Sequence, residues 1–411
     1  MDLKDQLEDL EQWAIEVILH NKQGFKENVA RFLLHGLSWI YAGVVQLRIK
    51  LYRERYIRDH HLGVPVISIG NLTVGGTGKT PVAELLARAL QKEGRNVAIL
   101  SRGYKSKRQK RVRFWTKWLA RVRGEELPQN PPRVVSNGER VLLDSHTAGD
   151  EPFMLASNLP GVPVVVDKDR VKAGLYAINE LNSDVLLLDD GLQYVRLKHR
   201  LDMVLIDRTS PWGNGFLLPR GTLREPPRHL KRASYIFLTK CDGSDNTEII
   251  RELRRYNRVA EIIECRHHPK YLENIHTRER VSLEKIYGAH VGAVSGIAVP
   301  ESFESGLRKL GAKVDVTLRF ADHHRFTLKD IRQFIDRCER RDVEMIVTTE
   351  KDFVRFPEVR NPEVPIYFLR VEIEIINGKE IFDRMIRILC EPRDVPQPVY
   401  GSELVGLPLE E

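Results

Sequence analysis

A glycine-rich segment, GNLTVGGTGKT at 70–80, carries the residue types that bind phosphate groups. It lies between a strand-like run at 64–70 and a helical pattern that follows it, which is the context that a phosphate loop requires. Glycines let main-chain N–H groups approach a polyphosphate, and the helix directs its positive end toward the same charge. Lys79 would neutralise β- and γ-phosphate oxygens, and the Thr80 hydroxyl would ligate Mg²⁺. The segment predicts a nucleotide site.

This loop meets the general P-loop pattern only in part, because Thr73 stands where GxxxxGK[ST] has its first glycine. The GGTGKT end is nearer to the loop of ATPases that carry K-G-G-x-G-K-[ST], but Val74 replaces the signature lysine. We assign nucleotide binding to the whole loop, namely Thr73, Val74, Gly75, Gly76, Thr77, Gly78, Lys79 and Thr80.

Two acidic pairs are candidates for the metal and for proton transfer. Asp189-Asp190 closes the apolar run VLLL, so it falls at the carboxyl end of a strand, where such sheets bind ligands. The pair resembles a Walker-B element, with Gln193 one turn further on, although a strand-end aspartate is often only a helix cap. Asp150-Glu151, in AGDEP, precedes a helical pattern and by itself indicates an N-terminal cap.

Two further motifs leave alternatives open. In Asp322-His323-His324 an Asp–His contact would orient a general base, whereas paired histidines are more often surface residues. The segment TKCD at 239–242 superficially matches the purine-selecting [NT]KxD of GTPases. A P-loop GTPase or metallochaperone is therefore the alternative to an ATP-dependent enzyme.

Composition indicates a globular protein: of 411 residues, 42% are hydrophobic and 30% are charged. The net charge of +8 suits anionic substrates, anionic lipid or nucleic acid. The four cysteines have no CxxC or His/Cys metal spacing, which argues against a structural zinc site and a disulfide framework and favours a reducing compartment.

Residues 105–123 hold nine basic residues and no acidic one, with Phe114, Trp115 and Trp118 between them. Such a stretch is typical of nucleic-acid or acidic-lipid binding, but more often it is a solvated insertion. A nucleic-acid-binding ATPase is the second alternative that this stretch leaves open.

The most apolar segment near the N-terminus, Phe32 to Leu47, is shorter than the roughly 20 residues of a membrane-spanning helix. Trp39 and Tyr41 suit the headgroup region, and several arginines follow. We expect a helix in an anionic membrane surface, with a helix buried against its own domain as the alternative.

Strand-like runs alternating with helical patterns predict a doubly wound α/β fold. A second α/β set begins near residue 289. The fold class is therefore α/β, a P-loop NTPase-like α/β/α domain plus a smaller α/β domain, with an N-terminal membrane-surface helix. The expected divisions are an N-terminal extension and interfacial helix at 1–60, a P-loop core at 61–240, a C-terminal domain at 241–390 and a tail at 391–411.

Taken together in their order, the motifs resemble tetraacyldisaccharide 4′-kinase, the lipid A 4′-kinase of Gram-negative bacteria. The resemblance covers roughly residues 35–385. It rests on GNLTVGGTGKTP, SRGY, GDEP, VDKDR, DDGLQ, GNG, LLPRGTLREP, DHH and TTEKD. It implies two α/β/α domains around a cleft, and transfer of the ATP γ-phosphate to the 4′-hydroxyl of a lipid A disaccharide 1-phosphate at the cytoplasmic face of the inner membrane.

The resemblance also implies roles for individual residues. Asp190 and Gln193, with Asp189 as a weaker candidate, would hold Mg²⁺ together with Thr80, and Asp150 would be the base on the acceptor side, tuned by His323 rather than His324. Substrate-side candidates are Asn71, Glu151, Arg224 and Glu225. We expect a monomer that binds ATP, Mg²⁺, the lipid substrate and an anionic membrane surface, but no nucleic acid. This chain departs from the family at Tyr194, where a histidine usually follows DDGLQ, and at Arg220 and Thr222.

Overall fold

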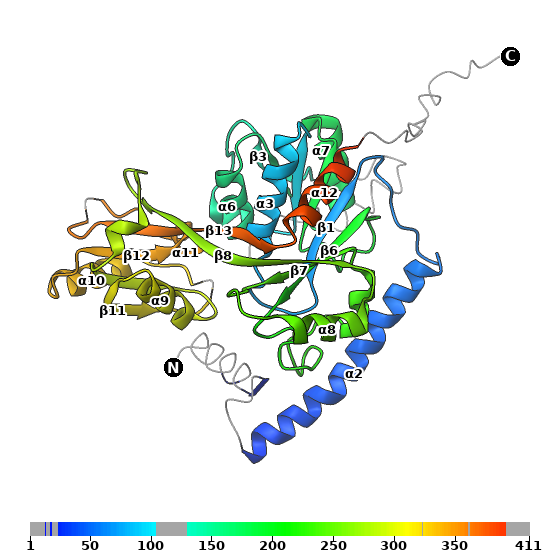
Figure 1. Cartoon of the computed structure of the whole chain (residues 1–411), viewed down its shortest axis with the longest axis horizontal. Coiled ribbons are helices and arrows are strands. Elements are labelled where there is room, and N and C mark those ends of the chain that lie inside the picture. The colour runs from blue at the N-terminus through cyan, green and yellow to red at the C-terminus, as the bar shows by residue number, and fades with distance from the viewer. Residues whose placement is uncertain are drawn as a thin grey trace, which may run out of the picture.

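One continuous sheet runs through the whole protein and joins two lobes (Figure 1). The computed structural model describes residues 13, 17–18, 24–103, 130–322, 324–360 and 362–391. Within these residues the strand order is β11-β10-β12-β13-β8-β7-β6-β1-β5-β2-β4-β3, and β9 pairs with β8. The basic stretch at 105–123, His323 and the tail beyond 391 lie outside the described residues, as does most of the segment before residue 24.

The first lobe is a mostly parallel sheet with helices on both faces. Its strands are β1 (Val66–Asn71), β2 (Val97–Ser101), β3 (Arg133–Asn137), β4 (Pro163–Val166), β5 (Val185–Asp189), β6 (Leu201–Asp207) and β7 (Tyr235–Thr239). Its helices are α3 (Lys79–Lys92), α5 (Ser145–Ala148), α6 (Asp150–Asn158), α7 (Arg170–Leu181) and α8 (Thr247–Tyr256), with a 3₁₀ turn η1 (Pro227–Arg232).

Burial on both faces explains why these strands are apolar almost throughout. In β1, Ile67 and Ile69 pack in a cluster with the buried residues of α3 and α6. Val66 points to the opposite face and packs in a cluster with α7. Because successive side chains of a strand alternate between faces, a sheet covered on both sides needs near-continuous hydrophobic runs.

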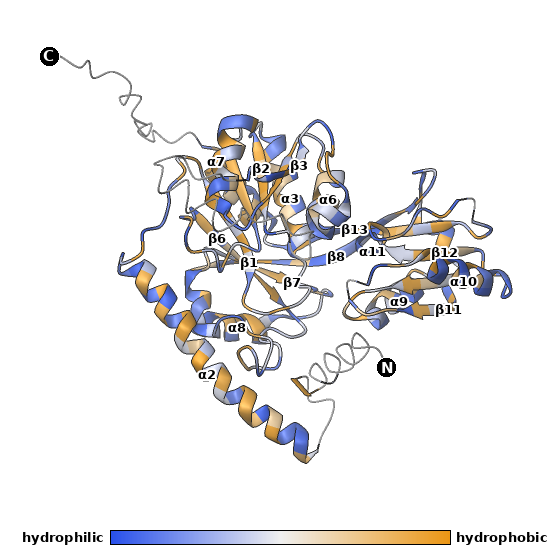
Figure 2. Ribbon diagram, turned by 180° about the vertical axis from the view of Figure 1, so that it is seen from behind, coloured by the Kyte–Doolittle hydropathy of each residue, from blue (hydrophilic) through white to orange (hydrophobic). Residues whose placement is uncertain are grey.

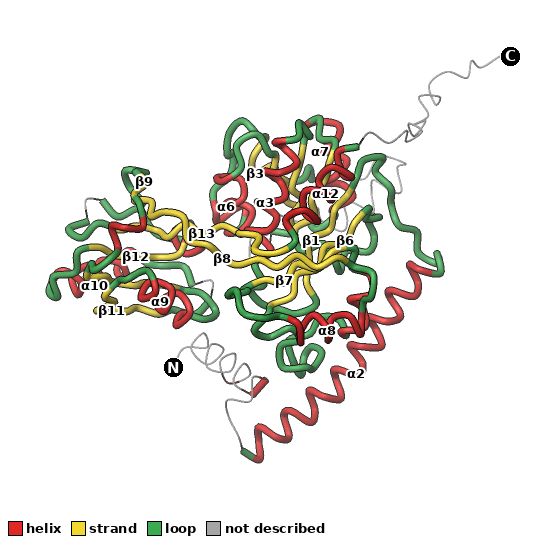
Figure 3. Tube along the Cα trace, viewed as in Figure 1, coloured by secondary structure: helices red, strands yellow, loops and turns green. Residues whose placement is uncertain are grey.

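The second lobe repeats the α/β pattern on a smaller scale. It contains β9 (Arg280–Val281), β10 (His290–Ser295), β11 (Lys313–Arg319), β12 (Met345–Thr349), η2 (Leu283–Ile286), α9 (Pro300–Lys309), α10 (Leu328–Glu339) and α11 (Glu350–Phe353). Two long antiparallel strands, β8 (Glu261–Asn274) and β13 (Ile366–Asn377), run from one lobe into the other (Figure 3). The chain then returns, because α12 (Lys379–Cys390) packs its Phe382 and Leu389 into the core cluster of the first lobe.

The predicted α/β fold class is confirmed, and the strands expected in the first lobe are present as β1, β2, β4, β5, β6 and β7. β3 and β8 were not predicted. In β8 the sequence EIIECRHHPKYLEN mixes apolar residues with histidines and charges, because only parts of this strand are buried. The boundaries at 60, 240 and 390 stay a prediction, since one sheet passes through both lobes.

A long helix, α2 (Phe25–Arg53), lies along one side of the first lobe and extends past it (Figure 1). It is longer than the apolar segment at 32–47. By length and composition alone it is the one helix of the described residues that could cross a membrane. Many residues of this helix are hydrophobic (Figure 2). Among them Phe32, Trp39, Ile40 and Leu47 are 57–79% exposed.

Candidate active site between β1 and β5

The predicted phosphate loop connects β1 to α3, as its sequence context requires. Gly78 lies in the left-handed region at φ 84°, directly before the first residue of the helix. Thr77 is anchored from behind, because the Thr239 hydroxyl donates to its carbonyl oxygen over 3.0 Å. A Cβ added at Gly75 or Gly76 would meet no atom within 4 Å, so the exposed tip of the loop faces open space. The loop has the free space beside its main chain that a phosphate group needs.

Lys79 turns back from α3 toward the strand ends. Its Nζ donates to Asn71 Oδ1 over 3.1 Å and lies 3.5 Å from Asp190 Oδ1. β1 and β5 are adjacent and parallel, with Ile69 opposite Asp189, and this register brings the acidic pair beside the phosphate loop. The predicted meeting of the loop with the Walker-B-like pair is therefore present in the structure.

The Asp190 carboxylate contacts two cationic side chains, Lys79 and Arg224. Arg224 Nη1 donates to both carboxylate oxygens, over 2.7 and 2.8 Å, in addition to the Lys79 contact. Burial raises the pKa of Asp190, but the charges of Lys79 and Arg224 together outweigh burial and lower its pKa below the usual value. Its backbone lies in the left-handed region at φ 55°, a conformation that aspartate tolerates better than most residues and that clusters at functional sites.

Asp189 has the opposite electrostatics. Its carboxyl group is fully buried and accepts one hydrogen bond from the Ser101 hydroxyl over 3.2 Å. Burial, followed by the negative charges of Glu151 and Asp190, raises its pKa to about 7. The neighbouring aspartates thus have pKa values moved in opposite directions, a property of sites that handle protons or cations.

The second acidic pair approaches from α6. The charge of Glu151 reaches Asp189, which places it in the same acidic cluster. Asp150, the first residue of α6, is buried and lies 3.5 Å from Arg355 Nε and 3.8 Å from Arg325 Nη2. Both arginines belong to the second lobe, so Asp150 stands where the two lobes meet.

Arg355 is held rigidly on the second lobe. Its side chain is fully buried, donates to Asp352 Oδ1 over 2.6 Å and also reaches the carbonyl oxygens of Gly296 and His324. Asp352 in turn accepts from the Gly296 N–H and from Thr349. The segment TTEKD therefore fixes an arginine against Asp150, a role that the motif alone did not reveal.

The choice between the two histidines stays a prediction, because His323 lies outside the described residues. His324 stacks on Phe320, with ring centroids 4.2 Å apart, and its Nε2 lies 3.6 Å from Asp330. These side-chain contacts of His324 are all within the second lobe.

Three of the predicted substrate-side residues, Asn71, Arg224 and Glu225, lie beside Lys79 together with Gln193, a predicted magnesium ligand. Gln193 Nε2 donates to the Asn71 carbonyl oxygen and to Glu225 Oε1, over 3.1 and 3.2 Å, and Gln193 Oε1 accepts from Arg224. The other oxygen of Glu225 accepts from His229 and Arg232. Asn71, Gln193, Arg224 and Glu225 are therefore brought together, although Glu225 is 2% exposed.

Sequence reasoning missed Arg170, whose only signal was its position in VDKDR. This arginine is buried, its charge reaches both Asp189 and Asp190, and burial lowers its pKa. Tyr194 stands where the family pattern has a histidine. The Arg170 guanidinium carbon lies over the Tyr194 ring, 5.0 Å from the ring centroid. The Tyr194 hydroxyl donates a hydrogen bond to Asp169. The tyrosine thus positions the start of α7.

The cluster can supply oxygen ligands to a magnesium ion. Asp189 Oδ1 and Thr77 Oγ1 are buried and have no hydrogen-bond partner, and Thr80 is buried at the start of α3. Carboxylate and hydroxyl oxygens are the donors that Mg²⁺ prefers, usually with phosphate oxygens and water completing the shell. Among the described residues no group of three His, Cys, Asp or Glu could hold a metal ion.

The parallel sheet, the phosphate loop after β1 and the acidic pair after β5 define a P-loop nucleotide-binding α/β protein. The chain belongs to the tetraacyldisaccharide-1-phosphate 4′-kinase family, whose profile matches residues 30–390.

Similar proteins of known name and one solved structure belong to the same family. A tetraacyldisaccharide 4′-kinase of Syntrophus aciditrophicus is 36% identical over 359 residues, covering 84% of this chain and 89% of that protein. One of Anaeromyxobacter dehalogenans is 38% identical over 341 residues, covering 82% and 85%. A crystal structure of LpxK from Aquifex aeolicus in complex with ATP has a TM-score of 0.67 at 28% identity, covering 88% of this chain and all of that one. Family membership favours the kinase prediction over the GTPase or metallochaperone.

Proposed function

We propose that this protein transfers the γ-phosphate of ATP to the 4′-hydroxyl of a tetraacyl disaccharide 1-phosphate, a step of lipid A biosynthesis. The main support for this proposal is that Lys79 Nζ lies 3.5 Å from Asp190 Oδ1, beside a phosphate loop with open space at its tip, in a member of this kinase family. The related LpxK structure with bound ATP supports ATP as the phosphate donor.

The loop from Thr73 to Thr80 binds the triphosphate in this proposal. Its N–H groups and the start of α3 attract the phosphates, and Lys79 moves from Asp190 to the phosphate oxygens when nucleotide enters. The positive charge of Lys79, which pairs with Asp190 in this structure, then stabilises the phosphoryl group during transfer.

Asp190, Asp189, Gln193 and Thr80 are the candidate magnesium ligands. A bound Mg²⁺ supplies positive charge that neutralises the phosphate oxygens. A bound cation would favour the ionised form of Asp189, whose pKa is raised, whereas the pKa of Asp190 is already lowered.

Asp150 is the candidate base that accepts the proton of the sugar hydroxyl. Arg355 lies near one oxygen of its carboxylate and Arg325 near the other, and these charges fix its orientation across the boundary between the lobes. His323 is the proposed partner of this carboxylate. Arg224 and Glu151 are proposed for the substrate edge of the site.

The exposed apolar side of α2 fits a membrane surface. A lipid substrate keeps its acyl chains in the bilayer, so the catalytic body must lie close to that surface. The helix offers Trp39, Ile40 and Leu47 to lipid and carries Arg48 and Lys50 near its end, which suits anionic headgroups. We place the protein as a monomer at the cytoplasmic face of the inner membrane.

The test is a kinase assay with labelled ATP and disaccharide 1-phosphate. We expect Lys79→Ala to lower turnover at least a hundredfold while melting temperature is unchanged, because the loss falls on transition-state charge. Lys92→Ala, at the exposed end of the same helix, is the matched control and should keep full activity. Near-normal turnover by Lys79→Ala would refute the site.

A further inference from the structure

One face of helix α2 contacts the loop at 217–224 directly. The Ser38 hydroxyl donates to the Leu217 carbonyl and accepts from the Arg220 N–H, over 2.9 and 3.1 Å. The Tyr41 hydroxyl donates over 3.0 Å to the main-chain carbonyl of Arg224, the residue that holds Asp190. A helix that served only as an anchor would not need polar contacts aimed at this loop.

A second path leads from the helix to Gln193. Gln46 Nε2 lies 2.9 Å from His229 Nε2, and His229 Nδ1 lies 2.6 Å from Glu225 Oε2. With an amide nitrogen facing the ring, His229 Nε2 accepts, so Nδ1 carries the proton and donates to Glu225. The other oxygen of Glu225 holds Gln193. The chain of hydrogen bonds is unbroken from α2 to a proposed magnesium ligand.

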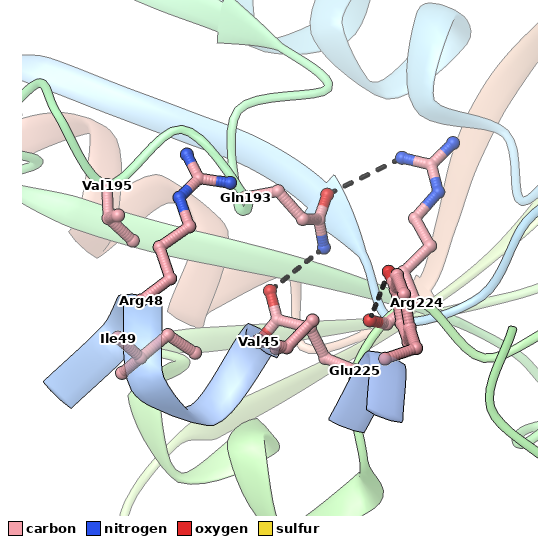
Figure 4. Close-up of a pocket in the computed structure, with 8 residues that line it drawn as sticks. Val45, Arg48, Ile49, Gln193, Val195, Arg224 and Glu225 are labelled. Atoms are coloured by element: carbon pink, nitrogen blue, oxygen red, sulfur yellow. Dashed lines mark hydrogen bonds between the residues drawn. The ribbon is translucent and has the colours of Figure 1, made fainter. Parts of the chain in front are cut away.

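A small cavity separates the helix from the site at the same place. Its volume is about 60 Å³, and Val45 and Ile49 of the helix line it together with Gln193, Arg224 and Glu225 (Figure 4). Ser38, Tyr41, Val45 and Ile49 are spaced three or four residues apart, so they share one helical face.

We propose that Gln46, Tyr41 and His229 are positioning residues of the phosphotransfer site, which couple the seating of helix α2 to Gln193 and Arg224. This inference rests on the proposed function for its catalytic consequence. Its direct consequence, the placement of Gln193 and Arg224 around Asp190, concerns magnesium and nucleotide binding and does not need the lipid substrate.

The experiment compares three variants of the full chain: Gln46→Leu, Tyr41→Phe and the exposed control Val44→Leu. ATP binding is measured calorimetrically over a range of Mg²⁺ concentrations, and kcat and KM are measured for the lipid. We expect Gln46→Leu and Tyr41→Phe each to raise the Mg²⁺ concentration at half-saturation about three- to tenfold, the effect of one lost buried hydrogen bond. The kcat should fall by a similar factor while KM for the lipid changes less.

A rescue variant distinguishes loss of the Gln46–His229 hydrogen bond from general destabilisation of the contact between helix α2 and the first lobe. Gln46→Lys keeps a donor opposite His229 Nε2 and should restore the magnesium dependence, whereas Gln46→Leu should not. Binding of ATP without Mg²⁺ and sedimentation with anionic vesicles should be unchanged in every variant. Unchanged magnesium dependence in both Gln46→Leu and Tyr41→Phe would overturn the coupling even if the kinase is fully active. Absence of lipid phosphorylation by the wild-type protein would overturn the proposed function instead, and the magnesium titration would still decide the coupling.

Discussion

A buried ion cluster ties the phosphate-loop helix to the second lobe, and removing its cation gives the most quantitative test of the structure. Arg370, in β13, is 3% exposed. It donates to both carboxylate oxygens of Glu350, over 2.8 and 2.7 Å, and also to Glu84 of α3. We expect Arg370→Met to lower the free energy of unfolding by about 3 kcal/mol, because two buried carboxylates lose their cation.

The magnitude follows from the remaining partners. Breaking a buried pair costs about 3–5 kcal/mol, and the lower end applies because Asn158 still donates to Glu350 and Arg88 to Glu84. A triple variant that adds Glu84→Gln and Glu350→Gln removes the stranded charges and should recover most of the loss. The assay is urea unfolding followed by tryptophan fluorescence, with the slope checked to be constant.

The pH dependence has a definite sign. Burial already raises the pKa of Glu350 in the wild-type protein, and loss of the Arg370 charge would raise it further. A carboxyl group with a raised pKa in the folded state stabilises the protein at low pH and loses that contribution as pH rises. The deficit of Arg370→Met should therefore be smaller at pH 5 than at pH 8. A loss below about 1 kcal/mol at pH 8, or no recovery in the triple variant, would refute the reasoning.

Three further predictions concern the site and the helix. Binding of Mg²⁺ and ATP at pH 6.5 should release a proton from Asp189 in addition to any that the nucleotide releases, seen as a dependence of the calorimetric heat on the ionisation enthalpy of the buffer, and Asp189→Asn should reduce this release. Arg355→Gln should lower kcat about tenfold or more and shift the pH profile of kcat, because Asp150 loses its orienting charge; an unchanged profile would contradict this role. Trp39→Glu should weaken sedimentation with anionic vesicles severalfold, and Val259→Glu, at a still more exposed apolar position on the body, should not.

Local sequence patterns were sufficient to predict the strands that end at the phosphate loop and at the acidic pair. The run before Lys79 and the run before Asp189 are continuous and apolar because both faces of the sheet are covered, so their positions and the polar residues at their ends were predictable. Their adjacency depends on strand order, which the doubly wound pattern suggests but only the pairing of β1 with β5 establishes.

The features that could not be predicted depend on contacts between residues far apart in the chain. Arg355 meets Asp150 from a distant part of the chain, and Arg370 joins two glutamates that no short motif links. β8 was not predicted because it crosses between the lobes, where partial burial leaves no regular hydrophobic period. Arg170 was visible only as one letter of a motif, and its proximity to Asp189 and Asp190 follows from the packing of α7 beside the sheet.

The most direct test of the account is to locate the label after incubation with γ-labelled ATP, Mg²⁺ and the tetraacyl disaccharide 1-phosphate in mixed micelles. We expect one new phosphate on the 4′-hydroxyl of the lipid, formed by the wild-type chain and absent with Lys79→Ala. Label released only as inorganic phosphate, or label at any other position of the lipid, would contradict it.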